Sequence, residues 1–260
     1  METRRSFLLG GSAALATLVA SGKPIRSSLG ADNVVKGVDG WSNPYVTDGL
    51  IAMWDGIWNV GGGVHDAGSS VWKDLVGSND MSLSASGITF GQDSIVCEQG
   101  GYAAMADSIP SFMTMEAVLS FDSSGGGRIA FSPIFTQSGY YNDDRWIAMR
   151  GNGTVNFCGN GKFIEGFGIG LARSVSCTYL SAQASYDNDV TLVFLDGLQT
   201  PISNTTGGYG FGVPRCNGVS PQSSYYFAGK IHNVRLYSRA LDSDEIESNY
   251  LVDKERFGLP

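Results

Sequence analysis

Short apolar segments closed by turn-forming residues recur along most of this chain, and they constrain its fold more than any other feature. Residues 50–54 are followed by Asp55 and Gly56, and residues 190–195 by Asp196 and Gly197. The 36 glycines follow no three-residue period, which excludes a collagen helix and favours many turns. We expect strands at 50–54, 88–90, 102–105, 112–121, 145–150, 154–158, 174–180, 190–195, 225–229 and 230–237.

Two local patterns are especially clear. Residues 151–153 read Gly-Asn-Gly between two of the expected strands, and these residue types tolerate the positive φ of a tight hairpin turn. Near the C-terminus, Asp242 predicts a helix N-cap with Glu245 reaching back to it, and Leu241 and Ile246 form a hydrophobic staple. Ile246, Tyr250 and Leu251 are expected to face the rest of the fold.

Many strands and one late helix predict an all-β fold. We expect two antiparallel sheets that pack into a β-sandwich, followed by one short C-terminal helix. A polar stretch at 31–46 reads as a linker, from which Trp41 and Tyr45 are candidates to pack onto the domain, and 47–260 reads as the sandwich domain.

The first 30 residues predict an export signal. Arg4 and Arg5 precede a short apolar run at 8–20, which is less than the roughly 20 residues that span a membrane. The paired arginines resemble a twin-arginine signal. An ordinary secretory signal and an uncleaved anchor remain alternatives, and only an uncleaved signal would give membrane contact. The mature protein is expected in the periplasm, on the cell surface or outside the cell.

The net charge limits the classes of partner, and the cysteine content bears on disulfide formation. The net charge is -8, which disfavours nucleic acid as a partner. The four cysteines match no zinc spacing, and an even number in an exported chain favours disulfides, with Cys158–Cys177 as the preferred pair. Four buried thiols are the alternative. The candidate cysteines are Cys97, Cys158, Cys177 and Cys216.

Three segments resemble the concanavalin A-like lectin/glucanase superfamily, in its bacterial laminin-G-like branch. They are 48–54 continued by 72–80, 194–197, and 227–241 running into Glu245 and Ile246. The resemblance implies a jelly-roll sandwich from about Thr47 onward. Asp74 is expected to bind loop backbone, and Arg235 and Arg239 to brace the corner between the last strand and the helix.

The catalytic pattern of the glucanases in this superfamily is not apparent. Those enzymes carry carboxylates at alternate strand positions, on one face of the sheet. Here Glu116 is the acid in an expected strand, and Val118 occupies the position two residues on. His232 reads as a packed strand residue, and His65 with Asp66 as a loop brace. The chain is therefore expected not to be an enzyme.

Sugar recognition commonly pairs aromatic faces with amide and carboxylate groups. That mixture predicts ligand-binding residues in two loops, although packing of these aromatics against the core is the alternative. A structural calcium ion is a second open possibility, with oxygen ligands drawn from Asp55, Asn59, Asp66, Asn142, Asp143 and Asp144. The glycan candidates are Tyr140, Tyr141, Asn142, Asp144 and Trp146 in one segment, and Trp58 and Asn59 in the other.

These observations predict an exported, non-catalytic carbohydrate-binding or adhesive module whose partner is a glycan. The alternative is a surface or assembly protein that uses the sandwich to bind other proteins. A glycoside hydrolase with an atypical site is the third reading.

Overall fold

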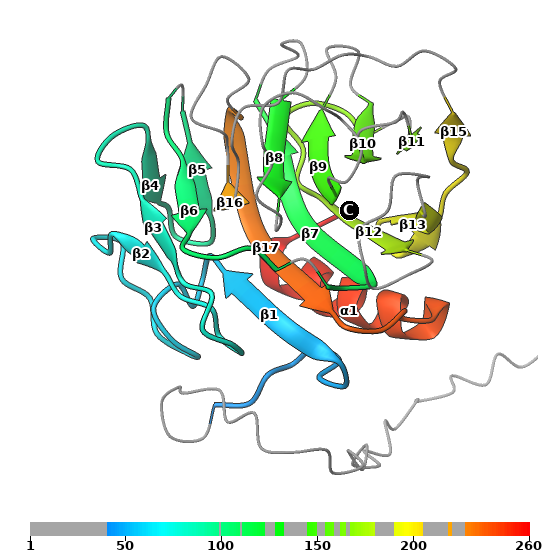
Figure 1. Cartoon of the computed structure of the whole chain (residues 1–260), viewed down its shortest axis with the longest axis horizontal. Helices are drawn as coiled ribbons and strands as arrows, with labels where there is room; N and C mark the ends of the chain where they lie inside the picture. The colour runs from blue at the N-terminus through cyan, green and yellow to red at the C-terminus, as the bar shows by residue number, and fades with distance from the viewer. Residues whose placement is uncertain are drawn as a thin grey trace, which may run out of the picture. The chain divides into compact units, whose positions relative to one another are not determined.

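In the computed structural model, the described residues form two antiparallel sheets that pack face to face and one helix that lies outside them (Figure 1). The described residues belong to the unit Asp32–Pro260. They are 41–98, 100–109, 111–122, 128–132, 145–149, 154–158, 162–164, 167–179, 190–204, 218–219 and 227–260.

In the described part of the chain, the first sheet has eight strands. Seven follow one path, and the eighth, β1 (Leu50–Asp55), pairs with the last strand of the chain. The path runs through β14 (Leu198–Gln199), β13 (Val190–Leu195), β12 (Arg173–Tyr179), β7 (Thr114–Phe121), β17 (Gly229–Tyr237), β5 (Ile95–Cys97) and β4 (Ile88–Phe90).

The second sheet comprises nine strands among the residues that the structure describes. Many are two or three residues long, and the hairpin expected around Gly151-Asn152-Gly153 appears as the antiparallel pair of β9 and β10. The order is β15 (Ser203–Asn204), β11 (Lys162–Ile164), β10 (Val155–Cys158), β9 (Arg145–Met149), β8 (Arg128–Ser132), β16 (Gly218–Val219), β6 (Ala103–Met105), β3 (Met81–Leu83) and β2 (Val71–Trp72).

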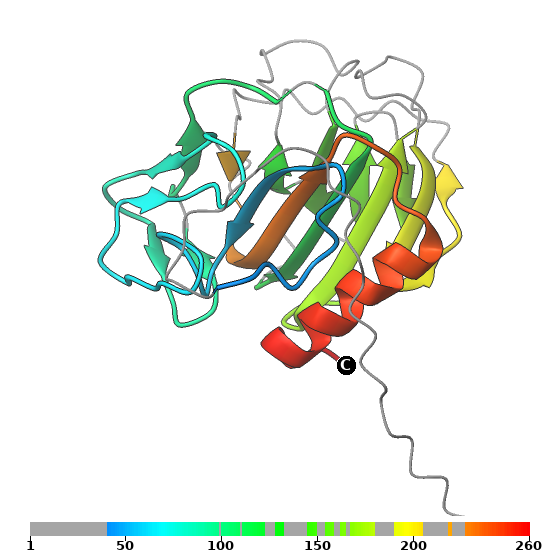
Figure 2. The ribbon, with the colours of Figure 1, turned by 90° about the horizontal axis from the view of Figure 1, so that it is seen from below.

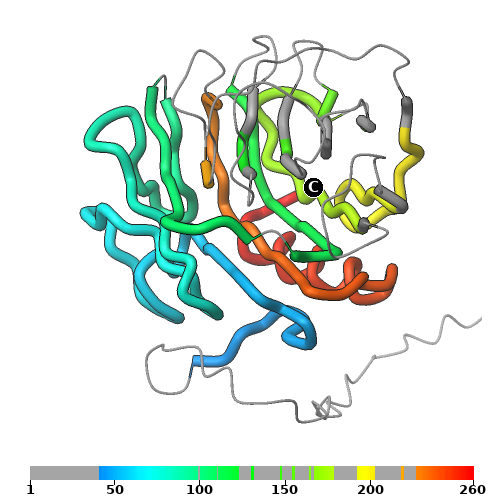
Figure 3. Tube along the Cα trace, in the orientation of Figure 1, coloured from blue at the N-terminus to red at the C-terminus, as the bar shows by residue number. Residues whose placement is uncertain are grey.

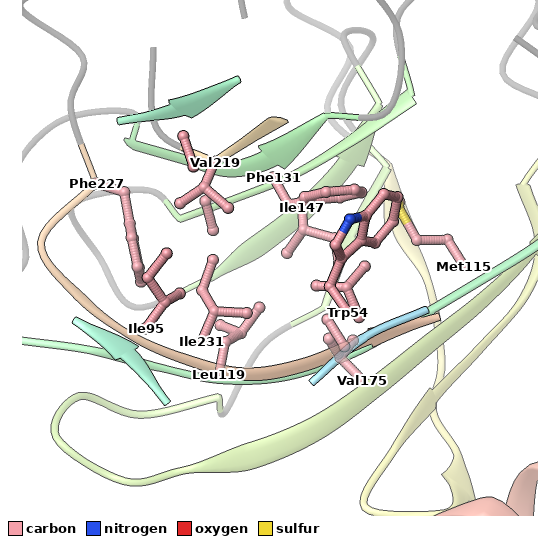
Figure 4. Close-up of a cluster of buried hydrophobic side chains, with 14 of the residues drawn as sticks. Trp54, Ile95, Met115, Leu119, Phe131, Ile147, Val175, Val219, Phe227 and Ile231 are labelled. Atoms are coloured by element: carbon pink, nitrogen blue, oxygen red, sulfur yellow. The ribbon is translucent and has the colours of Figure 1, made fainter. Parts of the chain in front are cut away.

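The core lies between the sheets, because alternate side chains of each strand point inward. Trp54 of β1 packs against Phe131 of β8 with ring centroids 5.6 Å apart, and both are fully buried. Figure 4 shows these two rings facing Ile147, Met115 and other core side chains from both sheets. The fold class predicted from the sequence is therefore confirmed.

Helix α1 (Ser243–Phe257) lies across the outer face of the eight-stranded sheet (Figure 2). Asp242 accepts a hydrogen bond from the Glu245 amide at 2.9 Å, and the Glu245 side chain accepts one from the Asp242 amide at 3.1 Å. The expected capping box is confirmed. Ile246 is buried as expected, but Leu251 is exposed, so the prediction that Leu251 faces the sandwich is wrong. No helix of the described part of the chain has the length and apolar character needed to cross a membrane.

Candidate functional site

A buried polar network lies between the eight-stranded sheet and α1. Its centre follows from strand register, because Glu116 of β7 is paired across the sheet with Arg235 of β17 on one side and Ser176 of β12 on the other. Arg235 Nε donates to Glu116 Oε2 at 2.9 Å, and the Ser176 hydroxyl donates to Oε1 at 3.0 Å. All three side chains are buried on the outer face.

The helix supplies the remaining partners of this centre. Asp253 accepts two hydrogen bonds from Arg235, at 2.8 and 2.7 Å, in the bidentate geometry that suits a guanidinium. The Asn249 amide donates to Glu116 Oε2 at 2.8 Å and to the Tyr237 hydroxyl at 3.0 Å. One guanidinium therefore joins a carboxylate of the sheet to a carboxylate of the helix.

Burial and charge oppose each other in this network. Burial raises the pKa of Glu116, and the neighbouring Arg235 only partly offsets that effect. Burial alone would lower the pKa of Arg235, but the charges of Asp253 and Glu116 outweigh it and hold that pKa well above its usual value. The network contains the carboxylates that acid–base chemistry needs, yet each is sealed from solvent and fully engaged. The network therefore acts as a structural clamp that holds α1 on the eight-stranded sheet.

A second group of contacts extends the network toward the N-terminal side. Asp55 accepts hydrogen bonds from both terminal nitrogens of Arg256, at 2.7 and 2.9 Å, and from the Asn233 amide at 2.8 Å. The Tyr45 hydroxyl lies beside these groups and accepts from Arg256 Nη1 at 2.6 Å. Residues of the expected linker thus pack onto the sandwich from Trp41 onward.

The loop that contains Trp58 and Asn59 is fixed from within. Asn59 is buried, and both ends of its side-chain amide bond to the backbone of Asp66. It donates to the Asp66 carbonyl oxygen at 2.7 Å and accepts from the Asp66 amide at 2.8 Å. The guanidinium of Arg256 lies over the Trp58 ring at 3.7 Å, and the Trp41 ring meets Trp58 edge-on at 5.2 Å. Packing therefore accounts for Asn59 and for one face of Trp58.

Several residues singled out in the sequence act as structural braces, as expected. Asp74 accepts hydrogen bonds from the backbone amides of Met53 and Val76, at 3.0 and 3.1 Å. The ring of His65 lies 3.2 Å from the carbonyl oxygen of Gly56, and His232 is packed in β17.

Arg239 braces the corner between the last strand and the helix, also as expected. It forms two hydrogen bonds with Glu245, at 2.7 and 2.6 Å. It also pairs with Asp48 at 2.8 Å. The segment that precedes β1 and the start of α1 are thereby joined at this corner.

The first glycan segment lies mostly outside the described residues. Tyr140, Tyr141, Asn142 and Asp144 are not described, and Trp146 is placed only as a position on β9. The structure therefore does not test this segment, and its role stays a prediction.

The cysteines do not follow the preferred pairing. Cys177 lies in β12 of the eight-stranded sheet and Cys158 in β10 of the nine-stranded sheet, so the assumption that a meander places their strands side by side is wrong. Cys97 and Cys177 are buried thiols, and the Cys177 thiol donates to the carbonyl oxygen of Met115 at 3.7 Å. Cys216 lies outside the described residues.

The proposed calcium ligands are engaged elsewhere wherever the structure describes them. Asp55 is neutralised by Arg256, and Asn59 holds Asp66 by its backbone. Within the described ranges, no group of three or more His, Cys, Asp or Glu side chains is arranged to hold a metal ion.

Sequence reasoning did not identify Tyr45, Asn249, Asp253 and Arg256 as network members. Positions 246, 249 and 253 are spaced so that they share one helix face, which was the available signal. Asn and Asp at such positions are usually solvated, and their burial depends on a sheet face whose outward residues are polar.

The comparisons with known proteins identify the family. A family model described as the concanavalin A-like lectin/glucanases superfamily, Laminin_G_3, matches residues 99–247. The chain belongs to this family. No curated protein matches the chain in sequence.

Among solved structures, this laminin-G-like chain is similar to Trypanosoma rangeli sialidase. The complex of that sialidase with sialic acid has a TM-score of 0.54 at 16% identity, over 80% of this chain and 33% of the sialidase chain. Its covalent intermediate with 2,3-difluorosialic acid has a TM-score of 0.55 at the same identity and coverage. At this identity the likeness shows the fold alone, and the chain spans about a third of the sialidase chains that it matches.

These findings correct the function predicted from the sequence. The expected non-catalytic carbohydrate-binding or adhesive module, with a protein-binding surface module as its alternative, is contradicted because the similar solved structures are sialidases, which are catalytic proteins. The described residues show the sandwich and its clamp, and no catalytic site appears among them.

Proposed function

We propose that this chain serves glycoside hydrolysis, as the β-sandwich part of a sialidase-type enzyme that acts on glycans carrying sialic acid. The observation that carries the proposal is the likeness of its fold to sialidase structures over 80% of the chain. The chain spans 33% of the sialidase chain, so the activity of the whole enzyme belongs to the proposal and not to the likeness.

The segment 140–146 is the proposed place of glycan contact. It offers the aromatic rings of Tyr140, Tyr141 and Trp146, and Arg145 carries the guanidinium that pairs best with a carboxylate such as that of sialic acid. Arg145 and Trp146 lie on β9, whose pairing with β8 and β10 fixes the backbone there.

The test is to measure both hydrolysis and binding with the purified full chain. A fluorogenic sialoside reports hydrolysis, and titration with sialyllactose against lactose reports recognition of the sialic acid. We expect the chain to prefer sialyllactose, and Tyr141→Ala should weaken that binding by about 1–3 kcal/mol, as for a typical aromatic anchor. Leu251→Ala, at an exposed helix position, is the matched surface control.

The outcomes separate the parts of this proposal. Hydrolysis would place the catalytic groups within this chain. Binding without hydrolysis would place them on another part or partner. The proposal would be contradicted if the chain did not hydrolyse the fluorogenic sialoside and also did not prefer sialyllactose to lactose.

Export by the twin-arginine route is a further part of the proposal. It is supported by Arg4 and Arg5 directly before the apolar run at 8–20. Replacing both arginines by lysine keeps the charge but removes the paired guanidinium groups, so the precursor should accumulate in the cytoplasm. Unchanged export of this variant would contradict the twin-arginine assignment.

A further inference from the structure

Residues Trp41–Val46, here called the strap, connect the N-terminal region to the C-terminal helix. Figure 3 follows the chain from this segment into β1. Tyr45 is only 5% exposed, and its hydroxyl donates to Asp253 at 2.8 Å while accepting from Arg256. A phenol 208 positions away in sequence therefore completes the hydrogen bonding of a helix carboxylate.

The backbone and the first ring of the strap are also held. The backbone amide of Val46 donates to the side-chain oxygen of Asn249 at 2.9 Å. The side-chain nitrogen of Asn249 in turn donates to Glu116 of the sheet. A Cβ on Gly62 would lie 2.5 Å from the Trp41 ring, so the ring packs directly on the loop backbone. The strap thus contacts helix, sheet and loop at once.

The two halves of α1 are attached in different ways. The N-terminal half is anchored by apolar burial, through Ile246 and the preceding Leu241. They lie in a cluster with Phe194, which Tyr45 and Val46 of the strap and Val252 of the second half also join. The C-terminal half is anchored mainly by hydrogen-bonded side chains: Asn249, Asp253 and Arg256. Polar contacts require each partner to be present, whereas apolar burial is non-directional. The strap's hydrogen bonds go to Asn249, Asp253 and Arg256, so removing the strap weakens the second half more than the first.

The sheet face under the helix is also suited to solvent. Buried ion pairs contribute less to the stability of the folded state than well-packed apolar groups of the same volume, because both charges must lose their water. When such a face is uncovered, water can solvate it. Its outward residues on β7 and β12 are polar except for Val118: they are Thr114, Glu116, Ser120, Ser174, Ser176 and Thr178.

We propose that the strap is a latch for the C-terminal half of α1. With the strap docked, residues 249–257 lie on the sheet. When the strap is released, this half lifts and uncovers the polar face while the sandwich stays folded. The strap follows directly on residues 1–40 in the sequence.

Hydrogen–deuterium exchange on the full chain, followed by mass spectrometry, tests the latch. Tyr45→Ala should speed exchange in 249–257 about tenfold or more, as expected when hydrogen bonds to charged groups are lost. Exchange in β7 and β12 should not change. Tyr45→Phe keeps the ring but loses the hydroxyl contacts, so it should give a smaller acceleration in the same segment. Leu251→Ala, at an exposed position of the same helix, is the control.

Two results would overturn the latch. Unchanged exchange in 249–257 of Tyr45→Ala would show that the strap does not hold the helix. Equal acceleration in 249–257, β7 and β12 would show that the strap only adds to global stability. If Tyr45→Ala does not fold, the same comparison with Tyr45→Phe decides between these outcomes.

Discussion

Arg235 is the single residue on which most of the outer-face network depends. Its guanidinium is buried between Glu116 and Asp253 and also lies over the Tyr45 ring at 4.0 Å. Removing it leaves two buried carboxylates without their main counter-charge. We expect Arg235→Met to lower the free energy of unfolding by about 3–5 kcal/mol, the usual cost of breaking a buried ion pair from one side.

Urea unfolding followed by tryptophan fluorescence measures this loss. Arg239→Met is the matched control, because Arg239 also forms a bidentate pair but its side chain is 30% exposed. An exposed pair contributes at most about 1 kcal/mol. Equal losses in the two variants would show that burial of the network adds nothing to the effect.

His232 gives the protein a defined response to acid. Burial lowers its pKa from the usual 6.5, although Asp93 acts in the opposite direction. As the pH falls below about 6.5, the unfolded chain binds a proton at His232 more readily than the folded protein does. The free energy of unfolding therefore falls as the pH drops from 6.5 toward the lowered folded-state pKa.

His232→Asn should remove this part of the pH dependence. We would compare the unfolding free energies of the two proteins between about pH 7.5 and 5.5, a range in which ordinary carboxylates stay ionised. The raised pKa of Glu116 has the opposite sign, but it is present in both proteins and cancels in the difference. If the two curves stay parallel across this range, His232 is not the acid-sensitive group.

At the scale of elements, the start of α1 shows how much local sequence determines. The capping box is read from four residues, and its hydrogen bonds form as expected. Asp242→Ala should cost about 1 kcal/mol, because an amide of the first turn loses its acceptor. Ser243→Ala, one residue further on and exposed, should change stability by no more than about 0.5 kcal/mol. Thermal unfolding of both variants compares them, and an equal effect would show that the cap contributes nothing.

Strands were predictable where the segment was long enough to show a pattern. Segment 190–195 with its Asp196-Gly197 turn appears as β13, and both turn residues have positive φ. By contrast, β2 and β16 have two residues each, which is too short for any period. Strand order was not predictable either, since β10 and β12 follow closely in sequence but belong to different sheets.

At the scale of the whole molecule, the family and the sandwich could be predicted, but the site beneath the helix could not. The motif that runs through Arg235 to Glu245 marked the strand-to-helix corner correctly. The network also needs Tyr45 from the beginning of the described chain and Asp253 from its end, which no local pattern connects. Burial of Glu116 likewise depends on Arg235, 119 positions away.

The two buried thiols test whether the sandwich unfolds as one unit. Cys97 of β5 and Cys177 of β12 belong to the same core, although their strands are separated in the sheet by β7 and β17. Burial raises the pKa of the Cys97 thiol, which keeps it protonated and unreactive in the folded state. Alkylation at each position should therefore require opening of the core.

We expect Cys97 and Cys177 to be alkylated by iodoacetamide at the same rate in moderate urea, as peptide mapping by mass spectrometry would show. One shared core implies one cooperative opening, and each thiol then reports the same event. The helix latch makes no difference to this rate, because α1 covers the opposite face of the sheet from both thiols. Tyr45→Phe serves as the control: it should leave the two rates equal to each other. Faster labelling of Cys97 alone would mean that β4 and β5 open separately, and the eight-stranded sheet would then comprise two cooperative units.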